Sequence, residues 1–125
     1  MRMLIGTLSL VLVIAVSASA AAAKGGTRVE TAGSCSAAAG WKLSAKSDDG
    51  RIETEFQVDA NRVGKRWRVT LIRNGSIVFS GIRTTVAPSG SFTVRRLLAG
   101  PASGRIVASA AALDGGQRCR AQLSL

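Results

Sequence analysis

The chain contains no histidine and no tyrosine, and only two cysteines and two prolines. Without histidine, the usual general base of Ser–His and Cys–His enzymes and the commonest zinc ligand are missing. The sequence also has no P-loop motif and no Gly-x-Ser-x-Gly motif, which argues against phosphate-cradling loops and nucleophile elbows. We therefore predict a protein that is not an enzyme, with no catalytic, cofactor-binding or metal-binding residues and no cofactor.

Three weaker alternatives stay open. A Ser–Lys dyad could use Lys42 or Lys46. Glu53 and Glu55 share a face of a predicted strand about 7 Å apart, a separation that suits glycoside hydrolysis. The run 48–50, Asp-Asp-Gly, could touch calcium but lacks the other ligands of such a site. In each case a structural role is favoured. The lysines are expected to be solvated, and the two glutamates to face those lysines across the hairpin. The run at 48–50 is expected to form a plain turn.

The first 23 residues have the pattern of a secretory signal peptide. Arg2 precedes an apolar run at 4–16 and a stretch of small residues at 17–23, with cleavage predicted after Ala20, Ala22 or Ala23. An uncleaved anchor is the weaker alternative, because the apolar core has only about 13 residues. We predict a secreted or cell-envelope protein without stable membrane insertion after cleavage.

Acidic residues are scarce. Without Arg2, 16 Lys and Arg residues remain against 7 Asp and Glu, a net charge of +9, and 12 of the 16 are arginine. A polycation of this kind is attracted to polyanions. An Arg-rich composition beside abundant Ala and Gly is also what a GC-rich genome encodes, so charge alone does not establish a partner.

The two cysteines, Cys35 and Cys119, lie near the two ends of the exported chain. An even pair in an exported protein predicts one disulfide. It would close a loop of about 85 residues, which the loop-entropy model credits with about 4–5 kcal/mol of stability.

From Cys35 onward, short alternating segments are separated by turn signals, which is typical of an all-β protein. We expect residues 24–34 to form a disordered leader and residues 35–125 one domain. Residues 107–113 are Ala-rich and could form a helical turn, but strand is favoured because glycines bracket so short a segment. The seven predicted strands cover 41–46, 51–59, 65–73, 76–83, 92–95, 105–113 and 117–125. So many short strands predict an antiparallel two-sheet sandwich.

Several motifs along the chain resemble small exported immunoglobulin-like β-sandwich proteins of high-GC bacteria. They are Cys35, Trp41-Lys42-Leu43, Asp49-Gly50-Arg51-Ile52-Glu53, Arg66-Trp67-Arg68-Val69, Pro88-Ser89-Gly90-Ser91-Phe92 and Cys119. The resemblance implies an immunoglobulin-like fold but no activity. Trp67 is similar to the core tryptophan of immunoglobulin domains, whereas the cysteines would join the first and last strands, and the tyrosine corner is absent.

A basic sheet face is the candidate site. Alternation directs Arg66 and Arg68 outward from one strand and Arg118 and Arg120 outward from another, and an immunoglobulin-like arrangement places both strands in one sheet, flanking the strand at 105–113. Arginine suits bidentate contact with phosphate or carboxylate. Arg62, Lys65 and Arg73 are expected at the ends of this face.

We expect this face to bind anionic cell-surface polymers or acidic glycans. The simpler interpretation is that arginine is a soluble outward residue on strands. The alternative function is a protein-binding module, inhibitor-like or adhesin-like, that acts through the loops at 86–91 and 98–104. Nucleic acid is disfavoured as a partner, because no aromatic side chain is interleaved with the outward arginines to stack bases.

Overall fold

The computed structural model describes residues 27–125. The predicted signal peptide and its cleavage sites lie outside the described residues. Within the described residues the protein is all-β, with eight strands and no helix. The strands are β1 Arg28–Ser34, β2 Gly40–Asp48, β3 Arg51–Asp59, β4 Arg66–Arg73, β5 Ser76–Thr84, β6 Ser91–Ala99, β7 Arg105–Ala112 and β8 Arg118–Ser124. The segment at 107–113, for which a helical turn was the alternative, belongs to an extended strand that ends at Ala112.

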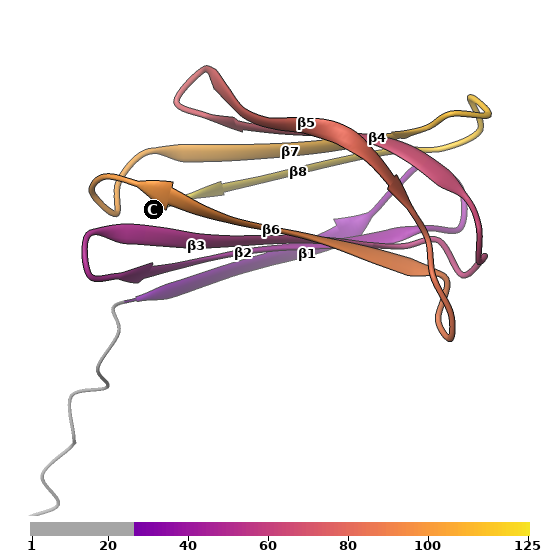
Figure 1. Ribbon diagram of the computed structural model, residues 1–125, viewed down its shortest axis with the longest axis horizontal. Helices are drawn as coiled ribbons and strands as arrows, with labels where there is room; N and C mark the ends of the chain where they lie inside the picture. The colour runs from indigo at the N-terminus through magenta and orange to yellow at the C-terminus, as the bar shows by residue number, and fades with distance from the viewer. Residues whose placement is uncertain (1–26) are drawn as a thin grey trace, which may run out of the picture.

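The strands form two antiparallel sheets of four that lie one above the other (Figure 1). Sheet A has the order β1-β2-β3-β6 and sheet B the order β5-β4-β7-β8. The two-sheet sandwich predicted from the alternation is therefore confirmed. The hairpin turns also match: Asp49 and Gly50, and likewise Asn74 and Gly75, have the positive φ angles that a tight turn requires at both central positions.

The prediction of seven strands and a disordered leader was wrong, because residues 28–34 form β1. This strand pairs with β2 over its whole length. Its only large apolar side chain is Val29, which packs against the core, and Gly33 leaves room for the ring of Trp41. The fold thus includes residues 28–34, ahead of Cys35, and residues 24–26 of the expected leader lie outside the described residues.

The core fills the space between the inner faces of the sheets. Trp67 of β4 is fully buried, and its ring lies 6.2 Å from that of Phe92 on β6, so the two aromatic rings join the sheets. Leu43, Phe56 and Ile106 are also fully buried. Each takes its place because alternate residues of a strand point to the same side of the sheet.

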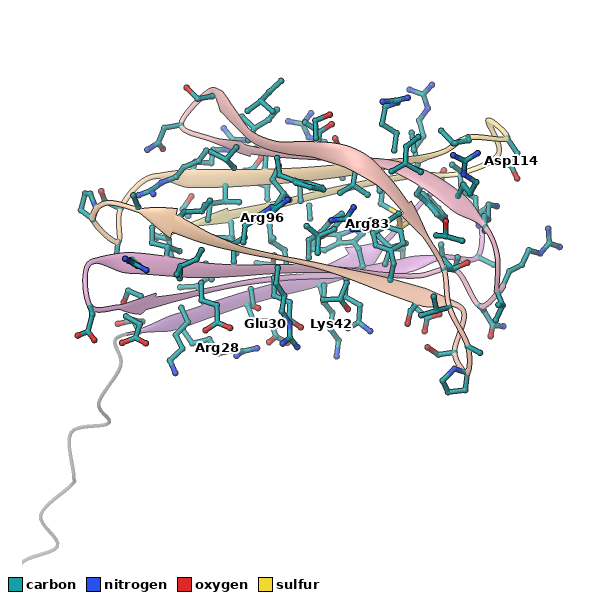
Figure 2. The ribbon with its side chains drawn as sticks, in the orientation of Figure 1. Arg28, Glu30, Lys42, Arg83, Arg96 and Asp114 are labelled. Atoms are coloured by element: carbon teal, nitrogen blue, oxygen red, sulfur yellow. A yellow bond between two sulfur atoms is a disulfide. The ribbon has the colours of Figure 1, made fainter. Side chains whose placement is uncertain are left out.

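The sandwich closes differently at its two sides. At one side the Cys35–Cys119 disulfide links the end of β1 to β8, as predicted. At the other, the side chains of Arg83 on β5 and Arg96 on β6 project between the sheets (Figure 2). Their guanidinium groups lie 4.9 and 4.4 Å from the ring centroid of Phe79, so two cation–π contacts cover this aromatic ring.

One core hydroxyl has no partner. Thr54 is fully buried, and its Oγ1 forms no hydrogen bond with any residue in 27–125. We expect Thr54→Val to raise the free energy of unfolding by about 1 kcal/mol, because it replaces an unpaired hydroxyl with a methyl group of similar volume. Chemical denaturation measures the change.

Thr85→Val is the matched control. Thr85 is equally buried, but its Oγ1 accepts the Lys65 backbone N–H at 2.9 Å and donates to the Arg62 carbonyl. Its loss should cost about 1–3 kcal/mol, because buried backbone groups are left unpaired. Equal destabilisation by both variants would show that the Thr54 hydroxyl also has a partner.

Removing the disulfide should act first on β1. Residues 35 and 119 are 84 positions apart, so Cys35→Ser with Cys119→Ser should lower the free energy of unfolding by about 4–5 kcal/mol. Because β1 has little apolar surface of its own, hydrogen exchange of its amides should accelerate more than that of β3. A uniform acceleration across all strands would contradict this role.

Candidate anion-binding face

The two sheets differ in charge. The strands of sheet A and the β2–β3 turn hold six Lys or Arg and six Asp or Glu residues, so their charges cancel. The strands of sheet B hold seven arginines and no acidic residue. They are Arg66, Arg68, Arg73, Arg83, Arg105, Arg118 and Arg120. Charge is thus segregated between the two layers.

Three of these seven arginines contact other parts of the fold. Arg73 donates to the backbone carbonyls of Ala99 and Pro101, the latter at 2.7 Å. Arg83 lies against Phe79, and Arg105 donates to the Gln122 side chain. These contacts give the three side chains a structural role.

The remaining four are the arginines predicted from the sequence. Arg66, Arg68, Arg118 and Arg120 are all exposed. Among residues 27–125, none of their guanidinium groups forms a hydrogen bond or an ion pair. We call this set the basic face. Its hydrogen-bonding capacity is fully available to a ligand.

The strand register places these side chains around β7. Arg68 is opposite Ala111 of β7, which is in turn opposite Arg118 of β8. Two strand spacings separate Arg68 from Arg118, about 10 Å between Cα atoms, and residues two apart on one strand are about 7 Å apart. Both arginine strands therefore belong to sheet B and flank β7, as the sequence predicted.

A shallow depression of about 360 Å³ lies among these arginines. Arg68, Arg118 and Arg120 stand around it, and its floor includes Ser109 and Ala111, whose side chains are short. Three arginines and no acidic residue line the depression, so all the charge around it is positive. It can hold an anion in contact with more than one guanidinium group.

Repulsion among the arginines of the basic face destabilises the fold only slightly. Two unit charges about 7 Å apart repel by only about 0.6 kcal/mol in water, and salt screens the repulsion further. Neutralising these arginines should therefore leave stability nearly unchanged.

The residues expected at the ends of the face lie elsewhere or have partners. Arg73 is turned away from the face by its bonds to Ala99 and Pro101, so the prediction was wrong for that residue. Lys65 is largely buried; its Nζ donates to Gln117 at 2.7 Å and lies 5.5 Å from the centre of the Trp67 ring. Arg62 precedes β4 in the loop that follows β3.

The outer face of sheet A balances its charges locally, and Arg28, Glu30 and Lys42 project from it (Figure 2). The Arg28 guanidinium group donates a hydrogen bond to the Glu30 carboxylate at 3.1 Å, and Arg95 Nε lies 3.2 Å from Glu55 Oε2. These exposed pairs contribute little to stability, but they leave this face without a positive field.

The pairing expected for the two glutamates is only partly correct. Lys46 is opposite Glu53, whereas Lys42 is opposite Gln57, because the register brings Ser44 opposite Glu55. The turn at Asp49-Gly50 is a two-residue hairpin connection. Residues 27–125 contain no group of three His, Cys, Asp or Glu side chains that could hold a metal ion.

Sequence reasoning missed the residues between the arginines. Thr70, Ser109 and Ala111 form the neutral centre of the face, and they follow directly from the alternation of β4 and β7. The available signal was the run of small residues on β7, which leaves space beside longer neighbours.

No protein-family model, curated protein or solved structure matches the chain. Within the described residues, no helix is long and apolar enough to cross a membrane. The resemblance to exported immunoglobulin-like proteins therefore stays a prediction.

Asp114, in the β7–β8 turn (Figure 2), is the acidic residue nearest in sequence to the basic face on β8, and it already has partners. Its carboxylate accepts the Gly116 backbone N–H at 2.9 Å and lies 3.5 Å from Lys65 Nζ. The hydrogen bond from Gly116, followed by the charge of Lys65, holds the pKa of Asp114 below its usual value of 3.8.

Because this pKa is lower in the folded state, ionised Asp114 stabilises the fold above its unfolded pKa. The contribution is lost as the pH falls from about 5 through the lowered pKa. We expect Asp114→Asn to lower Tm slightly at neutral pH and the difference to vanish in acid. Thermal unfolding across this pH range measures it, and a difference that persists unchanged in acid would exclude the charge as its cause.

Proposed function

We propose that this protein is an exported, non-enzymatic binding module whose basic face binds anionic cell-surface polymers or acidic glycans. The observation that carries the proposal is the contrast within sheet B. Three arginines are held by the fold, whereas the four of the basic face have no partner among residues 27–125, and three of those four surround one depression. A composition bias would add arginines but gives no reason for this division.

The chemistry of arginine supports the same partner. Its planar guanidinium group donates two parallel hydrogen bonds to phosphate or carboxylate. A face with a single sign of charge also attracts polyanions from a distance and speeds their association. The outer face of sheet A also carries arginines, but acidic residues balance their charge, so binding should depend on sheet B.

We also propose that the chain is secreted or retained at the cell envelope and that its sandwich is immunoglobulin-like. The signal pattern at residues 1–23 supports export, and the disulfide is compatible with an oxidising compartment. The order β8-β7-β4-β5 resembles the G-F-C-C′ sheet of variable-type immunoglobulin domains. On that correspondence, buried Trp67 takes the place of the tryptophan on strand C.

A second candidate function is protein binding through loops. Val86 precedes the turn at 87–90 and is 58% exposed, which favours an apolar contact there. The other expected loop is shorter than predicted, because β6 continues to Ala99 and buries Leu98. Binding of this kind should weaken only mildly with salt, whereas polyanion binding should weaken steeply.

The basic face is tested by removing its four charges together. We expect a variant with serine at all four positions, the Ser variant, to lose at least tenfold in affinity for wall polymers and acidic glycans at low salt, because about four charge-assisted contacts are removed. Binding of the exported protein is measured by calorimetry at two salt concentrations. The substitutions are Arg66→Ser, Arg68→Ser, Arg118→Ser and Arg120→Ser.

A control variant removes the same charge from sheet A and should bind like the wild type. Its substitutions are Lys42→Ser, Lys46→Ser, Arg51→Ser and Arg95→Ser. Both variants should retain the circular dichroism spectrum of the parent. Equal loss in the two variants would mean that only net charge matters, and binding that survives in both would move the site to the loops.

A further inference from the structure

The basic face continues into an apolar depression. A second hollow of about 370 Å³ lies farther along the outer face of sheet B, where Ile72 of β4 and Val107 of β7 are directly opposite each other. Arg120 lines both hollows, and Arg105 lies at the far side of the second. One surface therefore runs along β7 from arginines to aliphatic side chains.

An exposed isoleucine extends this apolar region. Ile77 of β5 is the register partner of Ile72 and is 66% exposed, the largest exposure among the large apolar side chains of residues 27–125. The register between β4 and β5 shifts at this point, which changes the residue opposite Ile72. A polymer bound only through its charge would not need contact with these aliphatic side chains.

We infer that the basic face takes the acylated end of an anionic polymer, with its charged groups on the arginines and an aliphatic chain over Ile72 and Val107. This inference rests on the proposed function and names the part of the polymer that is recognised. The ligand joins an acidic group, phosphate or carboxylate, to an aliphatic chain, because the two hollows share Arg120.

Charge complementarity selects this occupant over a second copy of the protein. The outer face of sheet B carries the four arginines of the basic face, and the strands of this sheet hold no acidic residue, so two copies face to face would repel. An uncharged aliphatic ligand would leave Arg68, Arg118 and Arg120 unpaired. An acylated polyanion satisfies both regions at once.

The surface also disfavours a ligand bound through stacked rings. The partly buried Trp41 belongs to sheet A, Trp67 is in the core, and Phe79 is covered by Arg83 and Arg96. Bases are held on aromatic side chains, and the outer face of sheet B has none. Thr70 and Ser109 offer hydroxyl groups with no partner among residues 27–125, which suits a polymer with polyol units.

The test compares one polymer with and without its acyl chains. Lipoteichoic acid is first freed of its alanine esters, so that the charge of the polymer stays the same, and part of it is then deacylated with alkali. Both forms are titrated into the exported protein, below the concentration at which the acylated form makes micelles. We expect the acylated form to bind about tenfold more tightly, a gain that needs only about two buried methylene groups. The gain should persist at high salt, because it is not electrostatic.

The apolar hollow is probed with Ile72→Thr and Val107→Thr, which keep β-branched side chains and so preserve strand propensity. This pair should reduce binding of the acylated polymer to the level of the deacylated one and leave the latter unchanged. Val63→Thr with Leu97→Thr is the matched control at exposed aliphatic positions elsewhere, and it should leave the binding of both polymer forms unchanged. Ile77→Ser, at an exposed position, gives a second variant should the first pair fold poorly.

The outcomes separate this inference from the proposed function. Equal binding of both polymer forms, lost only in the Ser variant of the basic face, would overturn the acyl inference and leave the proposed function standing. No salt-sensitive binding of either form would overturn both. A change in the oligomeric state of the ligand-free protein in the Thr pair, seen by analytical ultracentrifugation, would assign the hollow to a contact between copies instead.

Discussion

The link between β1 and β8 determines how the sandwich closes. These edge strands belong to different sheets, and Cys35–Cys119 joins them covalently near one end. The Ser36 backbone N–H donates to the Arg118 carbonyl at 2.9 Å, and the Arg118 N–H donates to Ser36 Oγ at 2.8 Å. β8 also pairs with β7 along its length, so Arg118 and Arg120 are held at a fixed register relative to the arginines of β4.

With the strands in place, the two sheets differ in surface charge because their outward-facing residues differ. Sheet A pairs acids with bases, as Glu55 does with Arg95, and its surface field cancels. Sheet B receives arginines without acids, and the fold uses Arg73, Arg83 and Arg105 for contacts of its own. The arginines of the basic face therefore form a positively charged surface on the outer side of sheet B, and the core around Trp67 packs against the inner side of the same sheet.

Alternation of apolar and polar residues made most of the fold predictable. Ile52, Phe56 and Val58 mark β3, Asn74-Gly75 marks a hairpin, and the two cysteines admit a single pairing, all as found. The positions of Arg66 and Arg68 on an outer face follow from the same alternation. Apart from the disulfide, which follows from there being only two cysteines, these features are local, so they can be predicted from neighbouring residues.

The features that the sequence did not reveal depend on distant partners. β1 carries one large apolar residue, and it becomes a strand because β2 and the disulfide are in place. The turn of Arg73 away from the basic face requires the carbonyls of Ala99 and Pro101, more than 20 positions along the chain. The extension of β6 to Ala99 likewise depends on pairing with β3 as far as Arg51.

The arginines that cover Phe79 also have a consequence for the unpaired sides of β5 and β6. Edge strands present free backbone groups that can pair with another chain and start aggregation, and charged side chains pointing into the sandwich at an edge oppose this. For a neighbouring copy to add a strand here, it would have to approach Arg83 and Arg96 side by side and bury both. Copies of the protein that lie close together on a charged surface would therefore stay separate domains and would not assemble into a fibre.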